Sequence, residues 1–424
     1  MNTPRCILTT FITLAALPLQ AADWPQYRGA TTDGITAEKV LKPWGGAKPK
    51  EVWKISSEGG FSSIVVGGGH AFTLSLKAVD GVKQESIVAL DANTGKELWF
   101  APLAFPKYDG GGDSGTSDNK GGDGPRSTPA IDATHVYALS SQLVLSAFEA
   151  ATGKPAWSHD LIKEFGGRNI QWQNAASPLI DNGLIYVAGG GADQSLIAFN
   201  SKDGSVAWKA FDEKMTHATP VATTLLGQRQ IIFFTQSGLL AVEPKTGKEL
   251  WRYKFQYNVS TASSPVVWGD IVYCSAGYGV GAGAVKITKQ GDQFAANEIY
   301  RVRGNKPLAN HWSTPVAKNG HFYGMFQFKE YGDGPIKCVD ATTGNVAWEK
   351  PGFGPGQMIL AGDQLVALSD KGELVLIEAN PAAYKELARA DILDGKCWTT
   401  PVLANGRIYA RSTKEAVCVD VSGR

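Results

Sequence analysis

The sequence has almost no excess of charge of either sign. Lys and Arg number 41 and Asp and Glu number 40, which gives a formal net charge of +1. Such a balance leaves no electrostatic footprint for nucleic acid or for an anionic membrane surface. Charged residues make up only 19% of the chain, against about 25% in an average soluble domain. We therefore expect no nucleic-acid partner.

Cysteine is scarce and never clustered. Cys6 lies close to the start of the chain, and the other four cysteines stand singly, without a C-x-x-C pair: Cys274, Cys338, Cys397 and Cys418. This spacing predicts neither haem attachment nor a zinc site. Disulfide pairing stays open, and buried small hydrophobic side chains are the simpler interpretation for most of them. No metal site is predicted from cysteine.

Only the first residues form a continuous apolar run. Arg5 precedes the largely apolar stretch Ile7–Leu19, and Ala21 and Ala22 follow it. A short positive start, an apolar run too short for a bilayer and small residues are typical of a secretory signal peptide. We predict a signal peptide at 1–21, an N-terminal extension at 22–50 and one domain at 51–424. The mature chain is then exported and soluble, in the periplasm or secreted, without a transmembrane segment.

The rest of the chain is rich in turns and large aromatic residues. Glycine occurs 49 times and tryptophan 12 times, and 43% of the residues are hydrophobic. Such a composition favours an all-β protein built of short strands. An eleven-residue pattern that reads as strand, tight turn and strand recurs at 89–99, 147–157, 198–208, 241–251 and 338–348. The first copy is A-L-D-A-N-T-G-K-E-L-W, in which the acid can bond the turn and glycine can adopt positive φ.

A second element, Ser/Thr-Pro followed by a short apolar strand, begins each unit. Clear copies lie at 126–131, 175–180, 217–222, 262–267, 312–317 and 398–403, and weaker ones at 61–66 and 355–360. Eight units over 51–424 average about 47 residues, the size of a four-stranded propeller blade. The last unit ends after its third strand, and the isolated strand 51–55 can complete it. We predict an all-β, eight-bladed β-propeller of four-stranded blades, closed by this N-terminal strand.

A glycine-rich acidic insert at 109–124 precedes the second blade. Its oxygen-bearing side chains are dense enough to suggest a calcium loop. The spacing fits no EF-hand and lacks a closing glutamate. A surface loop is therefore the favoured interpretation.

The eleven-residue units resemble the tryptophan-docking motifs of the pyrroloquinoline quinone (PQQ) propeller superfamily, A-x-D-x-x-T-G-x-x-x-W. The opening D-W-P-Q-Y-R-G at 23–29 also resembles exported bacterial PQQ-like repeat proteins. The resemblance implies that the docking tryptophans pack between blades and have a structural role: Trp99, Trp157, Trp208, Trp251 and Trp348.

The superfamily includes quinoprotein alcohol dehydrogenases and non-catalytic relatives of the BamB type. The dehydrogenases are longer, hold calcium with carboxylate and amide ligands, and commonly carry an adjacent Cys-Cys disulfide. This chain has no adjacent cysteines and no matching calcium ligand or catalytic aspartate, so it resembles the BamB-like members more closely. It also lacks the lipidation cysteine of BamB.

The residue three before each strand proline is expected to face the mouth of the central channel. Around the ring these positions are Phe61, Arg126, Ala175, His217, Ala262, Trp312, Pro355 and Trp398. Adding residues of the same approach loops gives the candidate ligand-binding set: Arg126, Trp172, Asn174, His217, His311, Trp312 and Trp398. Aromatic and basic side chains without a carboxylate favour an anionic or aromatic ligand, or a protein partner.

No catalytic residue is predicted. General acid–base chemistry needs a positioned acid or base, and the mouth offers only two histidines, which without a carboxylate companion make a weak metal site. The favoured function is a non-catalytic exported scaffold that binds a protein or ligand. The alternative is a PQQ-dependent quinoprotein dehydrogenase of alcohols or sugars with an altered site, for which PQQ and calcium would be the cofactors. A carbohydrate binder that uses Trp172, Trp312 and Trp398 as platforms is a third interpretation.

Overall fold

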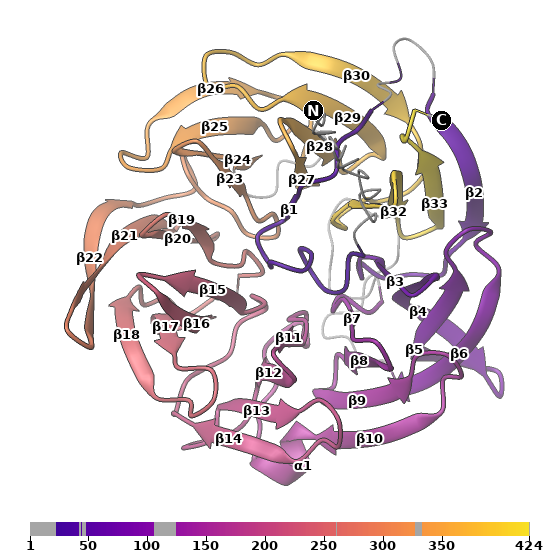
Figure 1. Ribbon diagram of the computed structural model, residues 1–424, viewed down its shortest axis with the longest axis horizontal. Coiled ribbons are helices and arrows are strands. Elements are labelled where there is room, and N and C mark those ends of the chain that lie inside the picture. Colours follow the sequence, from indigo (N-terminus) through magenta and orange to yellow (C-terminus); the bar gives the residue numbers. More distant parts are fainter. Residues whose placement is uncertain are drawn as a thin grey trace, which may run out of the picture.

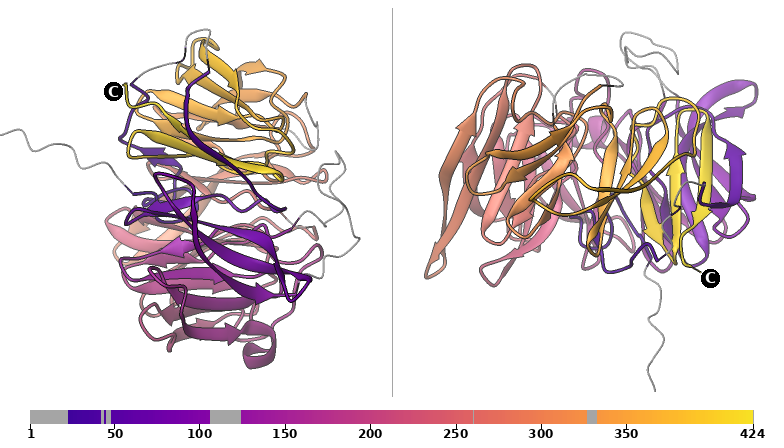
Figure 2. Two further views of the ribbon diagram at one scale, coloured as in Figure 1. Left: turned by 90° about the vertical axis from the view of Figure 1, so that its right-hand side faces the viewer. Right: turned by 90° about the horizontal axis from the view of Figure 1, so that it is seen from above.

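A computed structural model of the chain describes residues 23–41, 44, 48–105, 124–259, 261–326 and 333–423. The predicted signal peptide lies outside these residues, as does all of the glycine-rich insert except Gly124. Eight sheets stand around a central channel in one ring, which the side views show as a thick disc (Figures 1 and 2). Among the described residues no helix has both the length and the apolar character needed to cross a membrane.

Each of the first seven blades has four antiparallel strands that run in chain order from the channel to the rim (Figure 1). The first four blades are β3 (Val65–Gly67), β4 (His70–Val79), β5 (Val82–Asp91), β6 (Glu97–Ala104); β7 (Ala130–Ile131), β8 (His135–Leu139), β9 (Val144–Glu149), β10 (Pro155–Asp160); β11 (Leu179–Asp181), β12 (Leu184–Ala188), β13 (Leu196–Asn200), β14 (Val206–Ala210); and β15 (Val221–Leu225), β16 (Gln228–Thr235), β17 (Gly238–Val242), β18 (Glu249–Lys254).

Blades 5 to 7 repeat the pattern, and one short helix, α1 (Leu161–Phe165), follows β10. Their strands are β19 (Val266–Trp268), β20 (Ile271–Ala276), β21 (Gly281–Gln290), β22 (Gln293–Val302); β23 (Val316–Lys318), β24 (His321–Met325), β25 (Ile336–Asp340), β26 (Val346–Lys350); and β27 (Gln357–Ala361), β28 (Gln364–Leu368), β29 (Glu373–Glu378), β30 (Glu386–Asp391).

Blade 8 is built from both ends of the described chain. Its inner strands are β31 (Val402–Ala404), β32 (Arg407–Arg411) and β33 (Glu415–Asp420), and its outer strand is β2 (Lys50–Ser56). β2 pairs antiparallel with β33, with Trp53 opposite Cys418 and Ile55 opposite Ala416. The predicted eight-bladed propeller and its closure by the N-terminal strand are confirmed. The closure supplies the fourth strand that the last blade lacks and leaves no gap in the ring.

The turn between the third and fourth strands is held by the acid of the repeated motif. In blade 1, Asp91 Oδ1 accepts hydrogen bonds from the backbone N–H groups of Asn93 and Thr94, each at 2.9 Å. Gly95 follows with φ of +70°. The side-chain bond from Thr94 is the largest cause that lowers the pKa of Asp91. The acids of the motif therefore shape turns.

The tryptophan that follows each such turn reaches toward the next blade. Nε1 of Trp99 donates to Ala150 O, that of Trp157 to Ser201 O, and that of Trp208 to Pro244 O, at 3.1, 3.1 and 2.7 Å. Trp348 likewise bonds Asn380 O at 2.9 Å. Trp53 of β2, which carries no T-G turn before it, makes the same bond to Ala92 O across the closure.

Trp251 departs from this pattern. Its Nε1 bonds the side chain of Gln230 within its own blade, at 2.7 Å. The next blade lacks the T-G turn, so it offers no equivalent carbonyl and glycine for Trp251.

The residues before the first blade form a strap, residues 23–41, which crosses the centre of the ring (Figure 1). Trp24 forms a bridge with Val66 of blade 1, and Pro25 O accepts from Ile131 N of blade 2 at 2.8 Å. Gln26 exchanges two hydrogen bonds with Ile180 of blade 3, at 2.9 and 3.2 Å. The strap is thus fixed to three consecutive blades by its first four residues.

Beyond these residues the strap continues to four more blades. Thr32 Oγ1 accepts from Ala222 N of blade 4 at 3.1 Å. The fully buried Arg28 donates to Thr314 O and Pro315 O of blade 6, at 2.9 and 2.7 Å. β1 (Ile35–Thr36) adds a parallel strand to β27 of blade 7, and Leu41 N donates to Val421 O beside blade 8. Part of the predicted extension therefore binds seven of the eight blades.

Substitution of a motif glycine by alanine tests whether the tryptophan contact stabilises the ring. A Cβ on Gly153 would lie 2.5 Å from Cε3 of Trp99, whereas a Cβ on Gly227 meets nothing within 4 Å. Both glycines have positive φ, +73° and +81°, so both substitutions carry the same backbone cost of about 1 kcal/mol. We expect Gly153→Ala to lower the free energy of unfolding by about 1–3 kcal/mol more than Gly227→Ala.

Urea unfolding of the two variants measures this difference. Equal losses would show that the tryptophan shifts at no cost and that the contact contributes nothing to stability.

Candidate functional site

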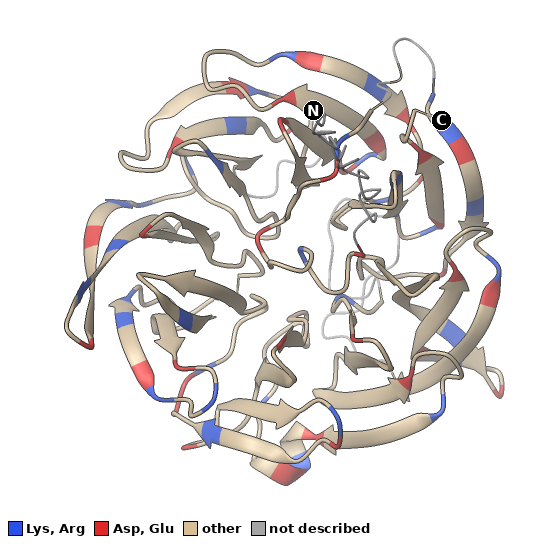
Figure 3. Cartoon of the chain, viewed as in Figure 1, with Lys and Arg blue, Asp and Glu red and all other residues tan. Residues whose placement is uncertain are grey.

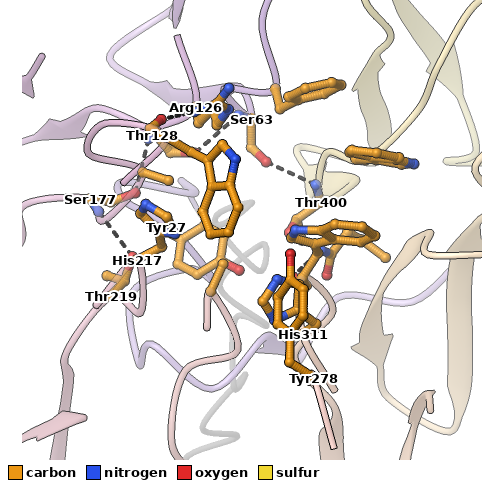
Figure 4. A pocket seen from close by; sticks show the side chains of 17 residues that line it. Tyr27, Ser63, Arg126, Thr128, Ser177, His217, Thr219, Tyr278, His311 and Thr400 are labelled. Carbon is orange, nitrogen blue, oxygen red and sulfur yellow. Dashed lines mark hydrogen bonds between the residues drawn. The ribbon is translucent and has the colours of Figure 1, made fainter. Parts of the chain in front are cut away.

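A ring of hydrogen bonds links neighbouring blades around the channel. At six of the eight seams the backbone N–H at the end of an approach loop donates to the equivalent side chain of the next blade, whereas the hydroxyls of Ser264 and Thr400 accept no such bond among the described residues. The six links are Ser63 N to Thr128 Oγ1, Thr128 N to Ser177 Oγ, Ser177 N to Thr219 Oγ1, Ser264 N to Thr314 Oγ1, Thr314 N to Gln357 Oε1 and Thr400 N to Ser63 Oγ, at 3.0, 2.9, 3.0, 3.0, 3.4 and 2.8 Å. The Ser/Thr-Pro element therefore supplies both the donor and the acceptor of this ring (Figure 4).

The ring surrounds a cavity of about 400 Å³ at the mouth of the channel. Seven of the eight expected ring positions line it. The exception is Pro355, whose place Gln357 takes. Blade 7 has no Ser/Thr-Pro element, and the longer Gln357 side chain bonds Trp312 O at 2.7 Å as well as Thr314 N. The lining residues are Tyr27, Phe61, Ser63, Arg126, Thr128, Trp172, Ala175, Ser177, His217, Thr219, Ala262, Tyr278, His311, Trp312, Gln357, Trp398 and Thr400.

Six aromatic side chains form an arc along the wall. Phe61 stacks on Trp398 with centroids 5.0 Å apart, and Trp398 stacks on Trp312 at 4.6 Å. His311 then meets Trp312 and Tyr278 edge-on, each at 5.0 Å. Tyr278 lies parallel to Trp172 at 6.2 Å, with 8° between the planes. The wall therefore offers flat and edge-on surfaces suited to an aromatic guest.

The arc begins above a buried ammonium group. The Nζ atom of Lys396 lies 4.7 Å from the centroid of Trp398 and 5.7 Å from that of Phe61. Lys396 is fully buried, so its cation–π contact is made away from water, where such contacts are strongest.

Arg126 contacts Trp172, the last aromatic residue of the arc. The Arg126 guanidinium donates a hydrogen bond to Trp172 O. Trp172 and Gln173 both have positive φ, +67° and +65°, a conformation that costs a non-glycine residue energy and is often found at functional sites. This backbone turns the Trp172 ring toward Tyr278.

Asn174 supports that loop and does not line the cavity. It is buried, and its Nδ2 donates to Ser140 O and Ala176 O, at 3.3 and 3.0 Å. Of the seven candidate ligand-binding residues, the structure brings the other six together around one cavity. Sequence reasoning did not include Tyr27 or Tyr278. The strap of Tyr27 is remote in sequence from the approach loops, and Tyr278 lies in the loop between β20 and β21, which is not an approach loop.

The charge at the cavity is positive. Among its described lining residues there is no carboxylate, and Arg126 is the one permanently charged side chain. Acidic and basic residues otherwise lie mainly on the outer strands and turns (Figure 3). His217 does not add charge, because burial, and then the charge of Arg126, lowers its pKa to about 3.

These residues fit one part of a quinoprotein cofactor and not the other. A planar anion matches the aromatic arc and Arg126. Calcium prefers carboxylate oxygens, which the lining does not offer. Within the described residues no group of three or more His, Cys, Asp or Glu could hold a metal ion.

The closed ring of eight four-stranded blades and its docking tryptophans define a propeller of the PQQ-like class. A family model described as outer membrane protein assembly factor BamB matches residues 83–324 and 332–422. The chain therefore belongs to the BamB family.

Individual relatives are distant. The BamB assembly factor of Moranella endobia is 24% identical over 302 residues, which cover 69% of this chain and 74% of that protein. The crystal structure of BamB from Moraxella catarrhalis matches with a TM-score of 0.59 at 14% identity, over 88% of this chain and 98% of that one. Quinohemoprotein alcohol dehydrogenase from Comamonas testosteroni matches with a TM-score of 0.65 at 13% identity, over 95% of this chain and 81% of that one. At these identities the two solved structures show the fold alone.

The low pKa of His217 predicts a specific loss of stability in acid. The folded state resists protonation down to about pH 3, whereas the unfolded chain takes up a proton near pH 6.5. The unfolded state therefore binds more protons between these values, and stability falls with pH by up to about 1.4 kcal/mol per unit. We expect His217→Gln to remove this part of the slope, so that the variant gains on the wild type as the pH falls from 6.5 to 3.

Urea unfolding at a series of pH values checks this, with His70→Gln at the first residue of β4 as the control. Parallel pH profiles of wild type and His217→Gln would contradict the assignment.

Proposed function

We propose that this chain is an exported, non-catalytic scaffold that holds a protein partner at the mouth of its propeller. The observation that carries the proposal is the mouth cavity, a half-open site with an aromatic wall, a cation and no carboxylate among its described lining residues. Buried aromatic and arginine side chains are the usual anchors of protein interfaces. A site whose two histidines have no carboxylate beside them among the described lining residues suits binding better than acid–base chemistry.

The family supports a role in the cell envelope. Its members carry the name outer membrane protein assembly factor. We infer that this chain acts in the periplasm on a similar task, with an envelope protein as its partner. The signal peptide predicted at 1–21 would deliver it there.

Cross-linking from the mouth tests this function. Tyr278 at the mouth and Ile299 on the outer strand of the same blade are exposed to 38% and 39%. A photoreactive benzoylphenylalanine placed at either position therefore has similar access to solvent. We expect the position 278 variant to form an adduct with an envelope protein in the native cells, and the position 299 variant to form little of it.

Mass spectrometry of the adduct identifies the partner. Equal yields of adduct at the two positions, or an adduct at position 299 alone, would place the partner away from the mouth and contradict the proposal.

A second candidate function is a PQQ-dependent dehydrogenase with an altered site. The stacked Trp398 and Trp312 and the guanidinium of Arg126 favour it, because a flat anionic quinone suits them. We expect calcium to leave any affinity for PQQ unchanged, since the described lining provides no carboxylate to hold the ion. Calorimetric titration with PQQ, with and without calcium, measures this.

The control for that titration is Arg126→Gln, which should weaken any binding of the anion. Tight binding that requires both calcium and Arg126 would overturn the scaffold proposal in favour of the enzyme.

A further inference from the structure

The strap places Tyr27 at the inner end of the mouth cavity. Tyr27 lines the cavity together with residues of the approach loops, although it belongs to the segment that crosses the ring (Figure 4). Its neighbours are both fixed: Gln26 by two hydrogen bonds to Ile180, and Arg28 by its bonds to Thr314 O and Pro315 O. Because these anchors hold the backbone on either side, Tyr27 forms a fixed floor.

A floor of this kind excludes a strand threaded through the channel. A guest must enter from the mouth and stop at the strap. A cavity of about 400 Å³ lies at the lower end of the range for small-molecule pockets and suits a side chain or a short loop tip. The guest is therefore one projecting group.

The wall selects the shape of that group. Trp172 and Tyr278 lie nearly parallel on one side, and Trp312 continues the arc beyond His311. Aromatic surfaces with these orientations prefer another ring, which they can meet face to face or edge on. The guanidinium of Arg126 adds a cation that favours the electron-rich face of a ring.

The Tyr27 hydroxyl determines which chemical group is favoured at the end of the guest. Within the described part of the chain the Tyr27 hydroxyl makes no hydrogen bond, and the residue is half-buried. A tyrosine hydroxyl can donate one hydrogen bond, so a guest whose tip carries a hydrogen-bond acceptor would satisfy it.

We propose that the mouth cavity receives a tyrosine side chain from a loop of the protein partner, with the Tyr27 hydroxyl donating to its phenolic oxygen. This inference rests on the proposed scaffold function and specifies the anchor that the partner presents. Phenylalanine offers the ring without the acceptor, and leucine offers neither. A site that bonds a hydroxyl discriminates against the analogue that lacks it.

Titration of the full mature chain with N-acetyl-tyrosine amide, N-acetyl-phenylalanine amide and N-acetyl-leucine amide tests the inference. Ligand-observed NMR gives the three dissociation constants. We expect the tyrosine amide to bind about five- to tenfold more tightly than the phenylalanine amide, the value of one net hydrogen bond. The leucine amide should bind more weakly than both.

Tyr27→Phe keeps the ring of the floor and removes its hydroxyl, so the preference for the tyrosine amide should disappear. Tyr300→Phe is the matched control. It also removes a tyrosine hydroxyl without a hydrogen bond among the described residues, but at the outer seam beside Gly344. This variant should keep the preference.

Equal binding of the tyrosine and phenylalanine amides to the wild type, or a preference that survives Tyr27→Phe, overturns the inference. Failure of all three amides to bind also overturns it. None of these outcomes bears on the scaffold itself, because the adduct from position 278 is measured with the partner and without the amides.

Discussion

Closure of the ring is the constraint on which the rest of the structure depends. A propeller blade buries its faces only against its two neighbours, so every seam must be sealed for any blade to be stable. Here β2 leaves the start of the domain to become the outer strand of the last blade, opposite β33. Thr400 N bonds Ser63 Oγ across the same seam at the channel, and Trp53 bonds Ala92 O nearer the rim. Three contacts at different distances from the channel therefore hold the two ends of the domain together: Thr400 with Ser63, β33 with β2, and Trp53 with Ala92.

The same closure creates the mouth. The Ser/Thr-Pro element begins a strand, where proline is tolerated, and in four of its six clear copies the hydroxyl accepts a hydrogen bond from the preceding blade. The residue two positions before that hydroxyl is then directed toward the channel axis in seven blades. A structural repeat thus sets out equivalent positions that differ in side chain, with arginine, histidine and tryptophan among them. The Ser/Thr-Pro element therefore contributes both to the joining of the blades and to the lining of the mouth.

This dependence explains how much could be predicted from the sequence. The repeated motifs give the length of one blade, the acid and glycine of its turn, and the absence of a fourth strand in the last unit. The number of blades and most of the mouth positions therefore follow from the spacing of the motifs. Tyr27 could not be found in this way, because the strap has no repeat and its route is set by separate bonds to seven blades. Asn174 illustrates the opposite error. Proximity in sequence to Trp172 suggested the cavity, but its amide is used to hold the turn at Ser140 and Ala176.

Blade 5 shows how a seam is sealed when the motif is lost. It lacks the T-G turn, Trp251 bonds within blade 4, and the hydroxyl of Ser264 has no hydrogen-bond partner among the described residues. The seam between blades 4 and 5 is held instead by Tyr253, whose hydroxyl donates to Glu298 at 2.5 Å.

Aromatic packing completes that seam. The guanidinium of Arg301 lies 3.3 Å from the centroid of Phe255, which is fully buried and packs edge-on against Tyr257. Side chains unique to this seam thus take over the task of the repeat. Tyr278 lies in the loop that joins β20 to β21 of this same blade. The most exposed aromatic residue of the mouth therefore stands on a blade that lacks the repeated turn.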